Sequence, residues 1–266
     1  MFDSLTPIIW VGITFPILLI MQRWTHSHLR GVSLLLTGNT NWSVLVYAII
    51  LFPGVLLHEL SHWLVANLLG VRTGKFSVLP QQQRDGSIRL GYVEYYKSAS
   101  VGPVRESLIG GAPLVFGTTA VLLIGFYVFG VSELAEVVQN GDVDGLSFVI
   151  GDLFATADFL VWLYLLFAVS NAMMPSAADR RAWPAFLALM SVAAVVLYIL
   201  GFQDIMWAGL AGPAATVFGY LGMAFSMTIA VNLVFMGIIV AFESLIGRIR
   251  GQHVEYGGEN AQISEF

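Results

Sequence analysis

The hydrophobic residues of this chain fall into six long runs separated by shorter polar segments. The runs cover about residues 6–22, 43–69, 107–130, 155–174, 183–202 and 214–243. About 20 consecutive apolar residues form a helix that can cross the roughly 30 Å hydrocarbon core of a bilayer. The pattern therefore predicts an all-α polytopic membrane protein with about six transmembrane helices.

The one sizeable polar insertion, about residues 71–106, follows the second run. It contains KFSVLP and SIRLGYVEYY, which are rich in β-branched and aromatic residues, with a turn signal at Asp85–Gly86 between them. We expect a β-hairpin or small sheet here. The chain then consists of a membrane-embedded domain, residues 1–246, and a polar C-terminal tail, residues 247–266, which we expect to be frayed.

Composition supports a membrane location. The chain is 57% hydrophobic and only 11% charged, whereas soluble domains carry about 25% charged residues. The lipid bilayer is therefore the expected surrounding. The net charge of −5 is spread along the chain without a basic block, so we expect no nucleic-acid partner. The absence of cysteine excludes disulfides and thiolate metal ligands.

The basic residues predict an orientation. Ten of the twelve Lys and Arg residues lie in the insertion, in the loop after the fourth run and after the sixth run. Six spans would put these three regions on one side of the membrane, and the positive-inside rule makes that side cytoplasmic. We expect a multi-pass protein of the cell membrane with both termini in the cytoplasm.

The second run contains an HExxH motif, His58-Glu59-Leu60-Ser61-His62. On a helix, residues four positions apart lie on one face, so both imidazoles can reach a single metal ion. The glutamate can then take the proton of a metal-activated water, and zinc suits two histidines plus one carboxylate. The alternative is that these polar residues only pair with neighbouring spans. Ionisable residues in a membrane helix are costly and usually functional, which favours the metal site.

The third metal ligand predicted from the sequence is Asp179, in SNAMMPSAADRRAWP. We expect the fourth span to break at Pro175 and to line a water-filled cavity there. Asp158 and Glu243 are weaker alternatives for the ligand. Asp179 also has a purely structural interpretation, because Ser176 can cap the next helix with Asp179 as its acidic partner.

These motifs and their order resemble the site-2 protease family of intramembrane zinc metalloproteases. HExxH in a membrane span is followed by a β-rich insertion, by GGAPLVFG and by an Asn171…Pro175…Asp179 pattern. In that family, an Asn–Pro pattern leads into Leu-Asp-Gly, whose aspartate completes the zinc site. Asn171 and Asp179 are eight positions apart, as the family pattern implies, although Ala178-Asp179-Arg180 replaces Leu-Asp-Gly. The resemblance covers about residues 43–184, with no PDZ domain.

The resemblance implies one Zn²⁺ per chain, bound by His58, His62 and Asp179, with Glu59 as the catalytic base. It implies cleavage of membrane-protein substrates within or near their transmembrane segments. Asn171 either binds the substrate backbone or an oxyanion, or makes an interhelical hydrogen bond. Two other functions stay open, namely a metal-handling or transport protein and an inactive protease-like binding protein. No oligomeric state is predicted.

The remaining polar residues within or between the runs have simpler interpretations. His26, His28 and His253 fall in a predicted loop or in the tail, where we expect them to be solvated. Asn232 lies within the sixth run and is expected to form an interhelical hydrogen bond. The strands of the insertion either pair with an extended substrate or only cover the mouth of the site.

Overall fold

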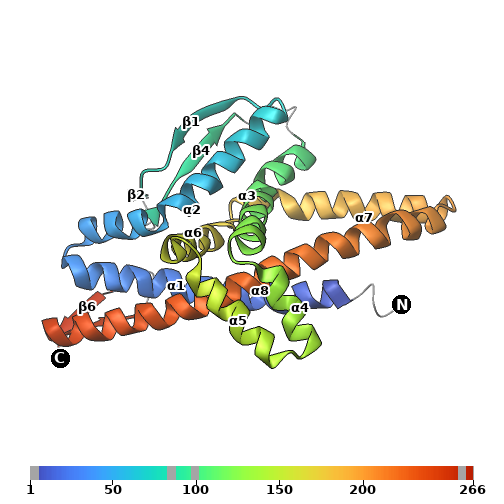
Figure 1. The fold of residues 1–266 in the computed structure, drawn as a ribbon. Helices are drawn as coiled ribbons and strands as arrows, with labels where there is room; N and C mark the ends of the chain where they lie inside the picture. Colours follow the sequence, from blue (N-terminus) through green and yellow to red (C-terminus); the bar gives the residue numbers. More distant parts are fainter. Residues whose placement is uncertain (1–5, 83–87, 97–101, 257–261, 266) are drawn as a thin grey trace.

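A computed structural model describes residues 6–82, 88–96, 102–256 and 262–265 (Figure 1). Helices dominate the fold, which confirms the predicted all-α class. The elements are α1 (Thr6–Thr37), α2 (Thr40–Leu68), β1 (Thr73–Ser77), β2 (Gln81–Gln82), β3 (Ile88–Arg89), β4 (Tyr92–Tyr95), α3 (Pro103–Leu123), the π-helix η1 (Ile124–Val128), α4 (Val131–Asn140), α5 (Val143–Ala155), α6 (Phe159–Ala172), the 3₁₀ helix η2 (Asp179–Ala182), α7 (Trp183–Ile199), α8 (Gln203–Arg250), β5 (Gln252–Glu255) and β6 (Gln262–Glu265).

Five helices of the described residues are long and apolar enough to cross a membrane, and a sixth span exists only if the bent pair α5 and α6 counts as one. Within the predicted run 155–174, the main helix is α6. Its 14 residues extend about 21 Å, which is too short to cross the roughly 30 Å core of a bilayer alone. α5 meets α6 at 89°. Asp158 lies at this bend with a left-handed φ of 56°. The fourth run is therefore a broken or re-entrant segment.

The helices α1 and α8 lie side by side and run in the same direction (Figure 1). Trp10 Nε1 donates to Ser226 Oγ at 3.1 Å near the start of α1, and His28 Nδ1 lies 2.7 Å from Glu243 Oε2 further along both helices. Two parallel helices that both cross a bilayer have their C-terminal ends on the same side and their N-terminal ends on the other. The prediction that both chain termini are cytoplasmic therefore holds only if one of these helices does not cross.

The first helix is longer than predicted, because α1 continues to Thr37 instead of ending near residue 22. His26 and His28 therefore lie in a helix, where they bond to Tyr47 and Glu243, and the prediction that they are solvated in a loop was wrong. Apolar residues three positions apart continue the buried face of α1 through this segment. They are Leu29, Val32 and Leu35.

The insertion forms the predicted small β structure. β1 pairs with β4 and β2 pairs with β3, both antiparallel. The predicted turn at Asp85–Gly86 lies outside the described residues. α3 begins at Pro103, slightly before the predicted end of the insertion, and the strands lie along α2 (Figure 1).

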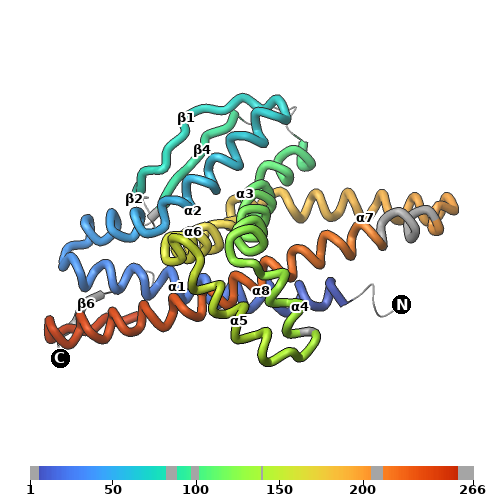
Figure 2. The backbone as a smooth tube through the Cα atoms, in the orientation of Figure 1, coloured from blue at the N-terminus to red at the C-terminus, as the bar shows by residue number. Residues whose placement is uncertain are grey.

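Three helices, α2, α3 and α6, pack closely where the chain breaks between α6 and η2 (Figure 2). A Cβ added at Gly54 of α2 would overlap the carbonyl of Ala168 in α6, and one at Gly117 of α3 would overlap the side chain of Met173. Small residues allow this approach of helix backbones. The irregular segment 173–178 contains Pro175, which confirms the predicted break.

The C-terminal segment is ordered rather than frayed in the residues described. β5 and β6 form an antiparallel pair directly after α8. Tyr256 packs against α1, where its hydroxyl would overlap a Cβ at Gly31, and it donates a hydrogen bond to Glu243. Burial and the Glu243 carboxylate raise the pKa of the Tyr256 hydroxyl above its usual value.

We expect Gly31→Val to detach the β5–β6 segment from α1, because the new side chain occupies the position of the Tyr256 hydroxyl. Faster amide hydrogen exchange in β5 is the measurement. Gly12→Val is the matched control, since no atom lies within 4 Å of a Cβ at Gly12 and both positions carry the same cost of valine in a helix. Equal rates of amide hydrogen exchange in β5 of the two variants would contradict the packing of the β5–β6 segment against α1.

Candidate metal centre

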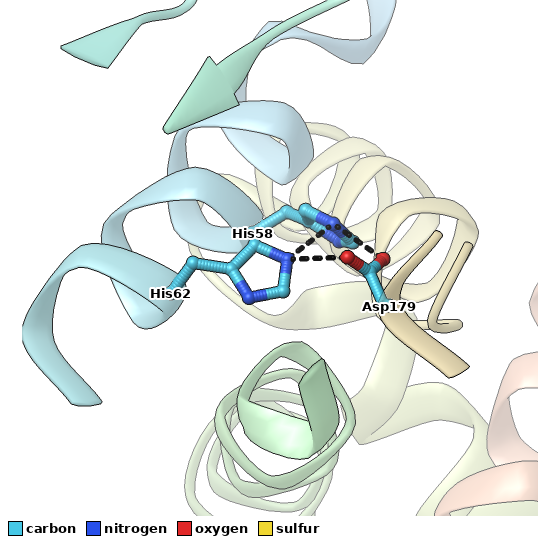
Figure 3. Close-up of side chains that lie close together, drawn as sticks. All are labelled: His58, His62 and Asp179. Carbon is cyan, nitrogen blue, oxygen red and sulfur yellow. Dashed lines mark hydrogen bonds and ion pairs between the residues drawn. The ribbon is translucent and has the colours of Figure 1, made fainter. Parts of the chain in front are cut away.

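Two histidines of α2 and one aspartate from a distant part of the chain meet at the break after α6 (Figure 3). His58 and His62 project from the same face of α2, with their Nε2 atoms 3.1 Å apart. Asp179, the first residue of η2, places Oδ1 3.3 Å from His62 Nε2 and Oδ2 3.6 Å from His58 Nε2. These three residues can hold a metal ion, since their ligand atoms lie within 4.8 Å of one another.

The spacing of the two imidazole nitrogens is close to that required by a tetrahedral ion. Ligands about 2.0–2.1 Å from a tetrahedral metal lie about 3.3–3.4 Å from one another. The Nε2 atoms of His58 and His62 are 3.1 Å apart, and each lies near a different oxygen of the Asp179 carboxylate. Three protein ligands leave the fourth position of a tetrahedron open.

Main-chain carbonyls orient both imidazoles. His58 Nδ1 lies 2.6 Å from the carbonyl oxygen of Ala172, and His62 Nδ1 lies 2.8 Å from that of Ile109. Both carbonyls lack a helical partner: Ala172 ends α6, and the residue four positions after Ile109 is Pro113, which has no N–H. The sequence therefore supplies free acceptors at the positions where the histidines need them.

This bonding assigns Nδ1 of both rings as the N–H donor. A neutral imidazole that donates from Nδ1 carries a lone pair on Nε2, whereas a protonated imidazole donates from both nitrogens. The two Nε2 atoms and the Asp179 carboxylate face one another at 3.1–3.6 Å. A positive charge among these atoms, either a metal ion or a proton on an imidazole, stabilises the arrangement, and donation of the second ring nitrogen to a carbonyl is typical of metal-bound histidine.

Asp179 has both of the roles considered from the sequence. The Ser176 N–H donates to Asp179 Oδ2 at 2.7 Å, and the Asp179 N–H donates to Ser176 Oγ at 3.3 Å. This is the reciprocal pattern of a capping box. The cap orients the carboxylate toward the histidines, so the structural interpretation supports the metal site instead of replacing it.

The approach of η2 to α3 depends on a glycine that the sequence analysis did not single out. A Cβ added at Gly110 would overlap the carbonyl oxygen of Asp179. At the adjacent Gly111, a Cβ would meet no atom within 4 Å. The Gly-Gly pair inside a helix was the available signal, because glycine is unfavourable there without a packing reason.

Glu59 lies beside the cluster in a cavity of about 680 Å³, which His58, His62 and Asp179 also line. The Glu59 side chain is buried beneath the segment between β3 and β4. A Cβ at Gly91 would lie 2.8 Å from Glu59 Cγ and 3.1 Å from its Oε1. The insertion thus covers the side of the site where Glu59 lies.

Asn171 lines the cavity, but both of its amide N–H groups are used inside the bundle. Nδ2 donates to the carbonyl of Phe167 at 2.9 Å and to Asn232 Oδ1 at 2.7 Å. The interhelical bond expected for Asn232 is therefore present. An oxyanion would need a donor that Asn171 already commits elsewhere, so its role in substrate binding stays a prediction.

The two alternative ligands lie away from the cluster. Asp158 precedes α6 and is separated from Ala172 by the length of that helix. Glu243 bonds to His28 in α1. Within the described residues, His58, His62 and Asp179 are the one group of three potential ligands that can share a metal ion.

No family model, no curated protein and no solved structure matches this chain. The functional interpretation rests on the motif and on the geometry of the cluster.

Proposed function

We propose that this protein is a membrane-embedded zinc endopeptidase that hydrolyses peptide bonds within or near the transmembrane segments of other membrane proteins. The observation that carries this proposal is the convergence of two imidazole nitrogens and a carboxylate beside Glu59 in one cavity. The order of motifs, which resembles that of site-2 proteases, supports the same function.

The donor set favours zinc. His58, His62 and Asp179 offer two nitrogens and one oxygen within 4.8 Å of one another, and the chain contains no cysteine to compete as a ligand. One ion per chain is expected to bind these three residues. When bound, zinc acts as a Lewis acid that makes water a nucleophile near neutral pH and polarises a peptide carbonyl.

Glu59 is the proposed general base. It follows His58 on the same helix, and its burial under Gly91 shields it from bulk solvent. Its carboxylate accepts the proton of the attacking water and returns it to the leaving amine. The cavity supplies room for this water and for an extended peptide.

The strands of the insertion, around Phe76–Val78 and Ile88–Tyr95, are the proposed site where a substrate strand pairs. Peptide bonds in a helix are shielded, so the substrate must be extended, and pairing with the edge of a strand holds such a peptide. A hairpin that only covers the mouth of the site is the alternative. Proline substitutions along Ile88–Tyr92 separate the two: lost cleavage with retained zinc favours pairing.

We propose that the protein lies in the cell membrane, with the insertion on the cytoplasmic side. Half of the twelve Lys and Arg residues lie within the predicted insertion, residues 71–106. The insertion follows the end of α2 that is remote from the C-terminus of α8 (Figure 1). If α1, α2 and α8 all cross, the C-terminal strands lie on the side opposite to the insertion.

A transport function is less well supported. Ion transport uses polar or acidic ligands along a path through several spans. The described residues contain a single compact cluster, whose ligands come from α2 and η2.

Metal analysis tests the proposed site. We expect the purified protein to contain about one zinc per chain, and His58→Ala or Asp179→Asn to weaken binding by at least about a hundredfold, because the first removes one of three ligands and the second replaces a charged ligand by a neutral amide. His28→Ala is the matched control, since His28 bonds to Glu243 in another part of the fold. A protein that binds no metal, or a His58→Ala variant that retains it fully, would contradict the site.

A further inference from the structure

Arg89 is a cation at the edge of the proposed active site. It lies in β3 and lines the same cavity as His58, Glu59 and Asp179. No other Lys or Arg lines this cavity among the described residues. Nothing in the roles given above for the ligands and the base uses this residue.

The guanidinium is held toward the site. Arg89 Nε donates to the carbonyl of Gly91 at 3.0 Å, and the guanidinium carbon lies 5.3 Å from the centroid of the Tyr92 ring. Gly91 in turn packs against Glu59. The side chain therefore bends toward Gly91, the residue that covers Glu59, and it interacts electrostatically with the Glu59 carboxylate.

Arg89 is exposed, and among the described residues no carboxylate lies within ion-pair distance of it. A divalent ion would balance Glu59 and Asp179, so Arg89 leaves the cavity with one excess positive charge. A cavity of this sign attracts and orients an anion.

We propose that Arg89 determines specificity by binding a carboxylate of the peptide substrate close to the scissile bond. Arginine binds carboxylates through paired N–H groups, which fixes their orientation as well as attracting their charge. The carboxylate is either an Asp or Glu side chain or the C-terminus of the peptide. This inference rests on the proposed peptidase function.

The test measures cleavage by the full-length protein in detergent. A mixed peptide library, with products identified by mass spectrometry, gives the residues that flank the cut. Synthetic peptides based on the preferred sequence then differ only as Glu against Gln near the cut, and as free acid against amide at the C-terminus. The first pair reports a side-chain carboxylate and the second a C-terminal one.

We expect the wild-type kcat/KM to favour one of the two acids over its neutral partner by roughly tenfold to hundredfold, the size of a charge-assisted hydrogen bond. Arg89→Gln should bring this ratio close to one, and Arg89→Lys should keep part of it. Arg72→Gln is the matched control, because Arg72 is in the same insertion but does not line the cavity. Zinc content should be unchanged in all three variants.

Several outcomes would overturn the inference. A wild-type ratio near one for both peptide pairs would show that no carboxylate is recognised. An Arg89→Gln variant that loses activity equally on acidic and neutral peptides would assign Arg89 to the reaction itself or to folding. A zinc-loaded wild type that cleaves nothing would overturn the proposed function, and this inference with it.

Discussion

Replacing Glu59 by glutamine is expected to lower the rate of peptide hydrolysis by about 10²–10⁴-fold, the usual contribution of a general base, while zinc content stays at the wild-type level. Glutamine has nearly the same size as glutamate but does not accept the proton of the attacking water. The proposed metal ligands His58, His62 and Asp179 are unchanged in this variant. Parallel assays of peptide cleavage and bound metal provide the measurement.

Glu94→Gln is the control for this prediction. This variant carries the same Glu→Gln substitution at a residue of β4 that does not line the cavity. The Glu94 carboxylate accepts a hydrogen bond from the Lys75 N–H. Its activity should match that of the wild type. Full activity of the Glu59→Gln protein would exclude the proposed base, and loss of zinc from it would assign Glu59 to metal binding instead.

Gly110→Ala is expected to weaken metal binding by about 10–100-fold, the range seen when the support of a ligand is lost. The added methyl group overlaps the carbonyl oxygen of Asp179 and must push η2 away from α3. Asp179 then moves away from the two histidines, and the three ligand atoms no longer converge. Competition with a chelator of known affinity measures the change.

The neighbouring glycine makes this test specific. Alanine in place of glycine inside a helix stabilises it by up to about 1 kcal/mol, and that gain applies equally at Gly110 and Gly111. At Gly111 the methyl group meets no atom within 4 Å. Gly111→Ala should therefore keep full metal affinity. Equal affinity in the two variants would contradict the dependence of the site on the contact between Gly110 and Asp179.

The sequence predicted the helical class and the small β insertion because both follow from local patterns. Runs of apolar residues and an HExxH motif need no knowledge of tertiary contacts. The extension of α1 through His26 and His28 was missed because polar side chains interrupted the apolar run, although its buried face continued. The shortness of α6 was missed because the apolar run 155–174 does not reveal a bend at Asp158.

The candidate site was predictable to a different degree at each residue. His58 and His62 follow from helical periodicity, whereas Asp179 was expected from its place after the predicted break at Pro175 and was supported by the resemblance to a family pattern. The carbonyl that orients His62 had a signal in the sequence, since Pro113 leaves Ile109 without a helical partner. The proximity of Arg89 and Gly91 to Glu59 had none, because it depends on how the insertion packs against α2.

The carbonyls that orient the two histidines belong to two different helices, α6 and α3. The ligands therefore converge only when both helices are packed against α2, and an ion bound there stabilises that packing by thermodynamic linkage. At a free ion concentration one hundred times the dissociation constant, the native state gains about 2.7 kcal/mol. The supply of metal in the cell would then govern the lifetime of the chain under quality-control proteolysis as well as its chemistry.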